Sequence, residues 1–73
     1  MDKKFIYNNQ DITVDVYEKI RRVVEIIAER EKVDFDEIHK KFCESKTFQA
    51  LQLPESLMWS ESAEFIVDEY YRE

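Results

Sequence analysis

The 73-residue chain contains no glycine, and this absence excludes a class of sites. Loops that wrap around phosphate groups, and turns that bind dinucleotides, need glycine where the backbone takes positive φ or approaches the ligand closely. The known glycine-rich nucleotide-binding motifs are therefore absent from the sequence. We expect no nucleotide cofactor.

Cysteine and histidine are almost as scarce, with one residue of each, Cys43 and His39. A single cysteine cannot form a disulfide within the chain, and two such residues are too few for a structural zinc site. The sequence also contains no Asp-x-Asp calcium loop and no His-Glu-x-x-His pair. We therefore predict no bound metal, and a stability that comes from packing or from self-association.

His39 and Cys43 lie four residues apart on a predicted helix, so their side chains can face each other. A cysteine beside an imidazole is one way to form a reactive thiolate. In the second interpretation the pair has no chemical role: His39 is a half-exposed residue, and Cys43 is a small hydrophobic residue next to Phe42. We favour this second interpretation. Carboxylates are abundant but none belongs to a predicted buried pocket, so we expect no catalytic residue and no enzyme.

Long apolar runs are also missing. No segment approaches the ~20 apolar residues of a membrane span, and residues 1–7 lack the apolar stretch of a secretion signal. We expect no membrane association and a cytoplasmic protein. The lone thiol fits that reducing compartment.

Positive charge is deficient, with 17 acidic against 11 basic residues and a net charge of −6. This balance opposes the counterion release that drives nucleic-acid binding, so nucleic acid is a disfavoured partner. Residues 1–54 contain eleven acids and ten bases, whereas residues 55–73 contain six acids and only Arg72. The acidic surplus therefore lies in the last nineteen residues.

The first half of the chain combines a β-prone segment with a helical pattern. Residues 5–7 and 12–14 are two short β-prone runs around a polar turn, which predicts a small hairpin. Such a hairpin packs on the helices, pairs with another chain or forms a mobile arm, and the sequence leaves these three alternatives open. A capping-box-like start at Asp15 and apolar residues at helical spacing predict a helix over residues 15–31.

The second half contains three more helical patterns. A start at Asp34 predicts a helix that ends near Glu44, and Ser45 can cap a short third helix that Pro54 terminates. Ser60 or Ser62 can cap a last helix. We therefore predict an all-α domain of three to four helices over residues 15–73, with a helix-turn-helix-like pair at 34–53 and an arm or small hairpin at 1–14. The predicted core consists of Val16, Ile20, Val24, Ile27, Ile38, Phe42, Leu51, Trp59, Ile66 and Tyr70.

The pair at 34–53 resembles the DNA-binding helix-turn-helix pattern in several positions. It departs from that pattern because His39 and Cys43 replace the usual small residue and turn glycine. The would-be recognition helix, residues 46–52, carries one cation, Lys46, and no arginine that could read guanine. We keep a transcriptional regulator as an alternative interpretation.

The acidic C-terminal helix is the leading candidate for a functional surface. Glu61, Glu64 and Asp68 follow spacings of three and four on the predicted helix, with Glu69, Tyr71 and Glu73 close by. We interpret Glu61, Glu64, Asp68 and Tyr71 as a docking surface for a basic protein partner, because charge complementarity speeds and selects association. The alternative is a solvated acidic face that serves solubility.

Two motifs carry a resemblance to a group of small proteins. They are Phe42-x-x-Ser45-Lys46-Thr47-Phe48-Gln49-x-Leu51 and Pro54-Glu55-Ser56-Leu57-x-Trp59-x-Glu61-Ser62-x-x-Phe65-Ile66. Over about residues 24–72 the chain resembles small bacterial helical proteins of unknown function, encoded in compact, toxin–antitoxin-like operons, some beside ADP-ribosyltransferase-type toxins. The resemblance implies an accessory or antitoxin-like role and assigns no functional residues.

Together these observations predict a non-enzymatic protein–protein interaction module. The alternatives are the transcriptional regulator and a nucleic-acid mimic that inhibits a DNA- or RNA-processing enzyme. Because the predicted core is small, we also expect a homodimer.

Overall fold

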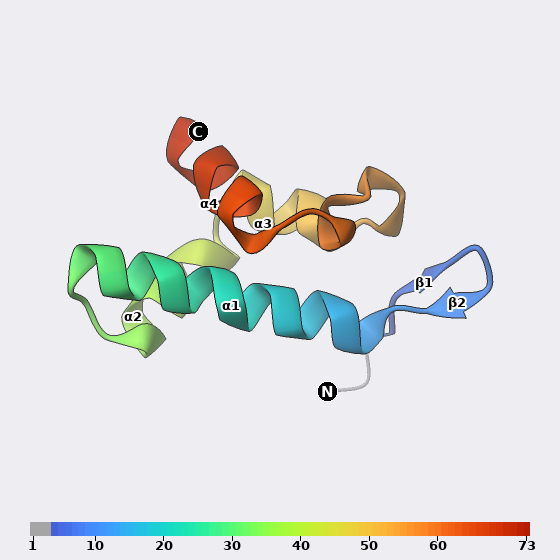
Figure 1. Ribbon diagram of the computed structural model, residues 1–73, viewed down its shortest axis with the longest axis horizontal. Coiled ribbons are helices and arrows are strands. Elements are labelled where there is room, and N and C mark those ends of the chain that lie inside the picture. The colour runs from blue at the N-terminus through green and yellow to red at the C-terminus, as the bar shows by residue number, and fades with distance from the viewer. Residues whose placement is uncertain (1–3) are drawn as a thin grey trace.

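The protein, described here by a computed structural model of residues 4–73, is a small, mostly α-helical domain (Figure 1). The first three residues of the predicted arm lie outside the described part. Two short strands precede four α-helices, and two 3-10 turns separate the last two helices. The elements are β1 (Ile6–Tyr7), β2 (Gln10–Asp11), α1 (Thr13–Glu31), α2 (Phe35–Cys43), α3 (Lys46–Leu51), η1 (Pro54–Ser56), η2 (Met58–Ser60) and α4 (Ala63–Arg72).

A hairpin is present and packs on the helices, but its second strand is Gln10–Asp11. The predicted second run, residues 12–14, is wrong as a strand, because these residues form the N-cap and the first residues of α1. Asn8 and Asn9 both have positive φ, 51° and 65°, as expected for the two-residue turn that joins antiparallel strands. Phe5 and Ile12 flank the two strands and are 2% and 3% exposed, and the Phe5 ring meets that of Tyr17 edge-on at 5.8 Å. Of the three alternatives that the sequence leaves open, the first therefore holds in the structure.

Helix α1 begins two residues before the predicted start at Asp15. The Asp11 carboxylate accepts a hydrogen bond from the Thr13 N–H at 3.0 Å, and the Thr13 hydroxyl accepts one from the Phe5 N–H at 2.8 Å. These bonds tie the hairpin to the first turn of the helix and place Asp15 inside that turn. The predicted capping start at Asp15 is therefore wrong, because Ile12 is the N-cap residue and Asp11 of the hairpin satisfies the first free N–H group, that of Thr13.

The helix-turn-helix-like pair has the predicted boundaries, although the Asp34 side chain makes no capping hydrogen bond. Asp34 and Glu44 flank α2, and the Ser45 hydroxyl accepts a hydrogen bond from the Phe48 N–H at 3.0 Å, so Ser45 caps α3 as predicted. The same hydroxyl donates to the Phe42 carbonyl oxygen at 2.6 Å, which ties the two helices together. Helix α3 ends at Leu51, and Pro54 opens η1.

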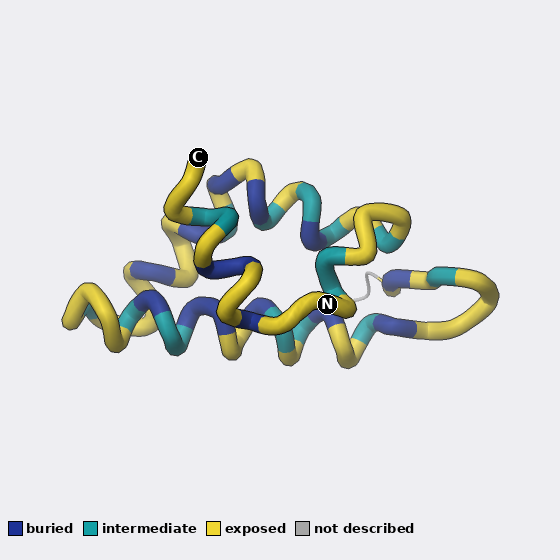
Figure 2. The backbone as a smooth tube through the Cα atoms, turned by 45° about the horizontal axis from the view of Figure 1, so that its top comes forward, coloured by how far each residue is buried: buried dark blue, intermediate teal, exposed yellow. Residues whose placement is uncertain are grey.

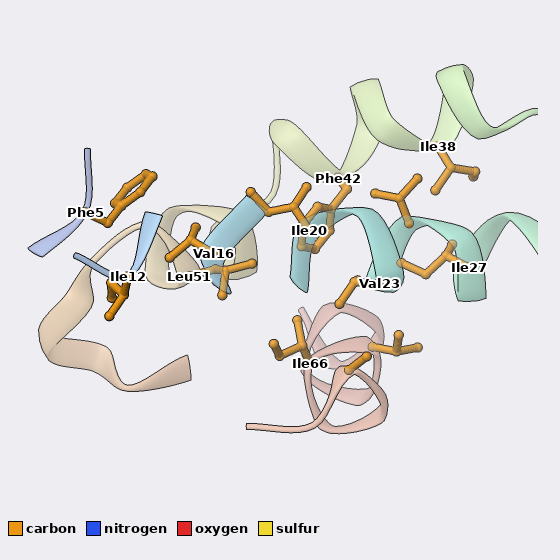
Figure 3. Packing of buried hydrophobic residues seen from close by; sticks show 13 residues of the cluster. Phe5, Ile12, Val16, Ile20, Val23, Ile27, Ile38, Phe42, Leu51 and Ile66 are labelled. Atoms are coloured by element: carbon orange, nitrogen blue, oxygen red, sulfur yellow. The ribbon is translucent and has the colours of Figure 1, made fainter. Parts of the chain in front are cut away.

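The core lies on both sides of α1. Figure 3 shows α2 packed on one side of α1, through Ile38 and Phe42, and α4 on the other side, where Ile66 faces Val23. Buried positions recur along α1 between exposed ones in Figure 2. The buried apolar residues are Phe5, Ile12, Val16, Ile20, Val23, Val24, Ile27, Ile38, Phe42, Leu51, Ala63, Ile66 and Val67.

Two predicted core residues, Trp59 and Tyr70, are only half-buried and pack against the edge of this cluster. The Trp59 Nε1–H donates a hydrogen bond to the Pro54 carbonyl oxygen at 2.9 Å, and its ring lies 5.7 Å from that of Tyr7. The Tyr70 ring lies 5.7 Å from that of Phe42. Both rings carry a polar group that stays near the surface, which explains their incomplete burial.

Leu57 adopts an unusual backbone conformation between η1 and η2. Its φ of 61° and ψ of 11° lie in the left-handed region, where glycine is the usual residue. For a residue with a side chain this conformation costs roughly 1–2 kcal/mol. The Leu57 side chain is nevertheless 41% exposed, so only part of it contributes to the packing of the domain.

Candidate interaction surface

Ser62 caps helix α4, because its hydroxyl accepts a hydrogen bond from the Phe65 N–H at 3.1 Å. This bond decides between the two predicted caps, Ser60 and Ser62. It also places Glu61 before the helix, in extended backbone, so Glu61 is outside the first turn. Glu64 is in the first turn, where the helix dipole favours a carboxylate.

The predicted docking residues lie along one exposed side of α4 and just before it. Glu64, Asp68 and Tyr71 are separated by four and three residues, which places them on one side of the helix. With Glu61 they form the open row, a name used below for these four residues. All four are exposed.

The three carboxylates of the open row form no ion pair within residues 4–73. Ion pairs among residues 4–73 join Arg21 and Arg22 to Glu25 within α1, and Arg72 to Glu69 within α4. Within that part of the chain, Glu61, Glu64 and Asp68 therefore have no ion-pair partner. Their negative charges face solvent, where an approaching cation can reach them.

Tyr71 connects the open row to the end of α1. Its hydroxyl donates a hydrogen bond to a Glu31 carboxylate oxygen at 2.8 Å. Burial and this bond raise the pKa of Tyr71 above its ordinary value, because both favour the neutral phenol. The bond places Glu31 beside the open row as a further carboxylate. Sequence reasoning missed it, because Glu31 lies forty residues away in the chain.

The side of α4 that lies next to α3 uses its charges internally. Glu73 accepts hydrogen bonds from the backbone N–H groups of Thr47 and Lys46, at 2.8 and 3.2 Å, and so caps the start of α3. Hydrogen bonding from Thr47 is the main cause of a pKa for Glu73 below its ordinary value. Glu69 pairs with Arg72 at 3.6 Å. We call Glu69, Arg72 and Glu73 the clasped side of α4.

The clasped side also bears on the helix-turn-helix interpretation. In such motifs the start of the second helix approaches the DNA backbone and bases. Here the Glu73 carboxylate occupies the start of α3, next to Lys46, the only cation of that helix. A phosphate at this position would meet a negative charge, so the arrangement disfavours DNA binding by α3.

His39 and Cys43 face each other, with the Cys43 sulfur 3.8 and 3.9 Å from the two ring nitrogens of His39. The imidazole also stacks on Phe35, with ring centroids 6.0 Å apart. Burial raises the pKa of the Cys43 thiol, and the neighbouring Glu44 raises it further. An activated nucleophile needs the opposite shift, so the pair has the properties of a structural contact.

The described residues offer little else that could hold a ligand. Within residues 4–73, no three His, Cys, Asp or Glu side chains come together as metal ligands do. An open hollow of about 510 Å³ lies beside α1 and η2, between the side chains of Lys19, Arg22 and Trp59. A second, of about 280 Å³, lies between α3 and α4 on the clasped side.

None of the helices within residues 4–73 has both the length and the apolar character needed to cross a bilayer. Comparison of the chain with known protein families, with curated proteins and with solved structures found no match. The resemblance to small bacterial operon proteins therefore remains a prediction from the two sequence motifs, and the geometry of α4 is the main guide to function.

Proposed function

We propose that the protein is a non-enzymatic interaction module that docks a basic protein partner through Glu61, Glu64, Asp68 and Tyr71. One observation carries this proposal, namely that the three carboxylates are exposed and lack an ion-pair partner within residues 4–73. Acidic residues elsewhere on α4, Glu69 and Glu73, do have internal partners. The open row therefore provides the charge that a basic surface needs for fast and selective association.

Tyr71 and Glu31 support the proposal at the far end of the row. The hydrogen bond between them fixes the orientation of the phenol, whose side chain is 46% exposed. An exposed tyrosine held in one rotamer loses little conformational entropy on binding, and its ring can contact a lysine or arginine of the partner. An antitoxin-like role, in which the module covers a basic surface of a toxin, is one form of this function.

The test is affinity capture from the native lysate with a charge-reversed variant. Changing Glu61, Glu64 and Asp68 to lysine shifts the net charge by +2 at each position, from −6 to 0. A matched control reverses Glu29, Glu44 and Glu55, which are exposed residues outside the open row, and also reaches a net charge of 0. The comparison separates the position of the charge from its total.

We expect the native chain and the control to retain one basic protein in a salt-sensitive manner, and the open-row variant to lose it. Equal capture by all three proteins would remove the docking proposal. Loss of capture by both variants would show that only the net charge matters. Retention of DNA or RNA without protein, or competition by DNA for the retained enzyme, would favour the regulator or the nucleic-acid mimic, respectively.

A further inference from the structure

Phe65 is an exposed aromatic residue on the outer side of α4. Its side chain is 41% exposed, whereas the next two residues, Ile66 and Val67, are fully buried in the core. Figure 3 shows Ile66 on the side of α4 that faces α1. The solvent side of an amphipathic helix normally carries polar or charged residues, so a phenylalanine at this position departs from the pattern that folds α4.

The fold itself makes little use of the Phe65 ring. Among residues 4–73, Phe65 belongs neither to the buried cluster nor to the half-buried residues that pack on it, and the ring contacts join other aromatic residues. Its backbone N–H donates a hydrogen bond to Ser62, which any residue except proline can do. The side chain is therefore free to contact another molecule.

Phe65 lies at the edge of the open row. It follows Glu64 directly and precedes Asp68 by three residues, a spacing at which the side chains of a helix are neighbours. Glu64 and Asp68 are exposed and form no ion pair within residues 4–73. An apolar ring and two carboxylates without ion-pair partners therefore share the outer surface of α4.

We propose that Phe65 is the apolar anchor of the docking surface, and that the basic surface of the partner contains an apolar site that covers the Phe65 ring. The proposal rests on the docking function proposed above and adds the chemistry of the partner. Exposed charges mainly speed and select association, whereas a few well-packed residues supply most of the affinity of an interface. A phenylalanine suits the second role, because burial of its ring leaves no polar atom unsatisfied.

Phe35 provides a comparison elsewhere on the surface. Its side chain is 38% exposed, nearly as much as that of Phe65, but it lies on α2 and stacks on the His39 imidazole, with ring centroids 6.0 Å apart. Two lysines, Lys40 and Lys41, lie in the last turn of the same helix. A basic partner is therefore expected to cover Phe65 and to leave Phe35 exposed.

The probes are two synthetic helical peptides with the same lysines, one with leucine and the other with glutamine along the side next to the lysines. Isothermal titration calorimetry of the full chain gives the Kd of each peptide. The native chain should bind the leucine peptide about tenfold more tightly, because only that peptide can cover the Phe65 ring. The preference should persist at higher salt, which weakens the binding of both peptides by screening the carboxylates.

Phe65→Ala should remove the preference for the leucine peptide, and Phe65→Leu, which keeps an apolar side chain, should retain most of it. Phe35→Ala is the matched control and should behave like the native chain. Circular dichroism of each variant checks that the helices still form. The rescue by leucine separates a contact of the side chain from an effect on folding.

Equal binding of the two peptides by the native chain, or a preference that survives Phe65→Ala, would overturn the role of Phe65. The docking function is tested separately with the variant in which Glu61, Glu64 and Asp68 are changed to lysine. If that variant loses both peptides, docking by charge holds whatever Phe65→Ala does. If it still binds them, the docking function itself is wrong.

Discussion

The two exposed sides of α4 differ in how they use carboxylates. On the clasped side, Glu73 caps α3 and Glu69 pairs with Arg72. On the open row, Glu61, Glu64 and Asp68 meet no cation within residues 4–73. The residue types are the same, and the difference comes from the neighbours: one side of α4 lies against the start of α3, and the other faces solvent. A carboxylate of this helix stabilises the fold where another element lies beside it, and can bind a partner protein where it faces solvent.

The largest effect should come from weakening the packing of α4 on α1, because both exposed sides of α4 depend on that packing. Ile66 is fully buried between α4 and α1. We expect Ile66→Ala to lower the free energy of unfolding by about 2–5 kcal/mol, which is a large share of the stability of so small a domain. Urea denaturation followed by circular dichroism measures the loss. Phe65→Ala, one residue away and 41% exposed, should cost clearly less, and equal losses would contradict the burial pattern.

Breaking the clasped side should cost less than breaking the core. Glu73→Ala removes the carboxylate that caps α3, and we expect a loss of about 1 kcal/mol, as for other helix caps. Glu69→Ala removes only an exposed ion pair within α4 and should cost at most about 0.5 kcal/mol. Thermal unfolding of both variants gives the comparison, and a larger loss for Glu69→Ala would reverse our assignment of the two roles.

The pH dependence of the free energy of unfolding should show that Glu73, on the clasped side, stabilises the fold. The pKa of Glu73 is lower in the folded chain than its ordinary value, so the carboxylate stabilises the fold above the unfolded pKa, and this contribution disappears as the pH falls through the folded pKa. We expect Glu73→Gln to lose less stability than the native chain between about pH 5 and pH 3. If the free energy of unfolding falls equally with pH in both proteins, the Glu73 carboxylate does not contribute to this pH dependence. Asp11, whose pKa is also lowered by hydrogen bonding to Thr13, remains in both.

The smallest effects should come from the open row. Tyr71→Phe removes one hydrogen bond to Glu31 at an exposed position, and we expect a loss of about 0.5 kcal/mol. Asp68→Asn should change the free energy of unfolding by less than about 0.5 kcal/mol, because Asp68 has no ion-pair partner within residues 4–73. Chemical denaturation tests both. A strong loss for Asp68→Asn would mean that the open row is structural and would weaken the docking proposal.

The parts of the fold that local chemistry determines were predictable from the sequence. Ser45 and Ser62 cap α3 and α4 as their positions suggested, and the apolar spacing identified the buried side of α1. The start of α1 was not predictable in the same way, because the Asp11 cap depends on the hairpin folding back onto the helix. The burial of Phe5 and Ile12 depends on the same long-range packing.

The candidate site shows the same limit. Helical spacing placed Glu64 and Asp68 on one side of the last helix, and the structure does so too, with Tyr71 continuing that side. The sequence also placed Glu69 and Glu73 close to that surface, whereas both belong to the clasped side. It gave no sign of Glu31, since only tertiary packing brings this residue to Tyr71.

The two long-range attachments of α4 also bear on how the chain is made. Tyr71 bonds to Glu31 across forty residues of sequence, and Glu73 bonds to Thr47 across twenty-six. The hairpin, α1, α2 and α3 can meet their sequence neighbours as they are synthesised, but the surface of α1 around Val23 stays uncovered until residues 63–72 have been translated. The nascent chain therefore carries this apolar surface until residues 63–72 have been made, so the segment that covers it is also the acidic one.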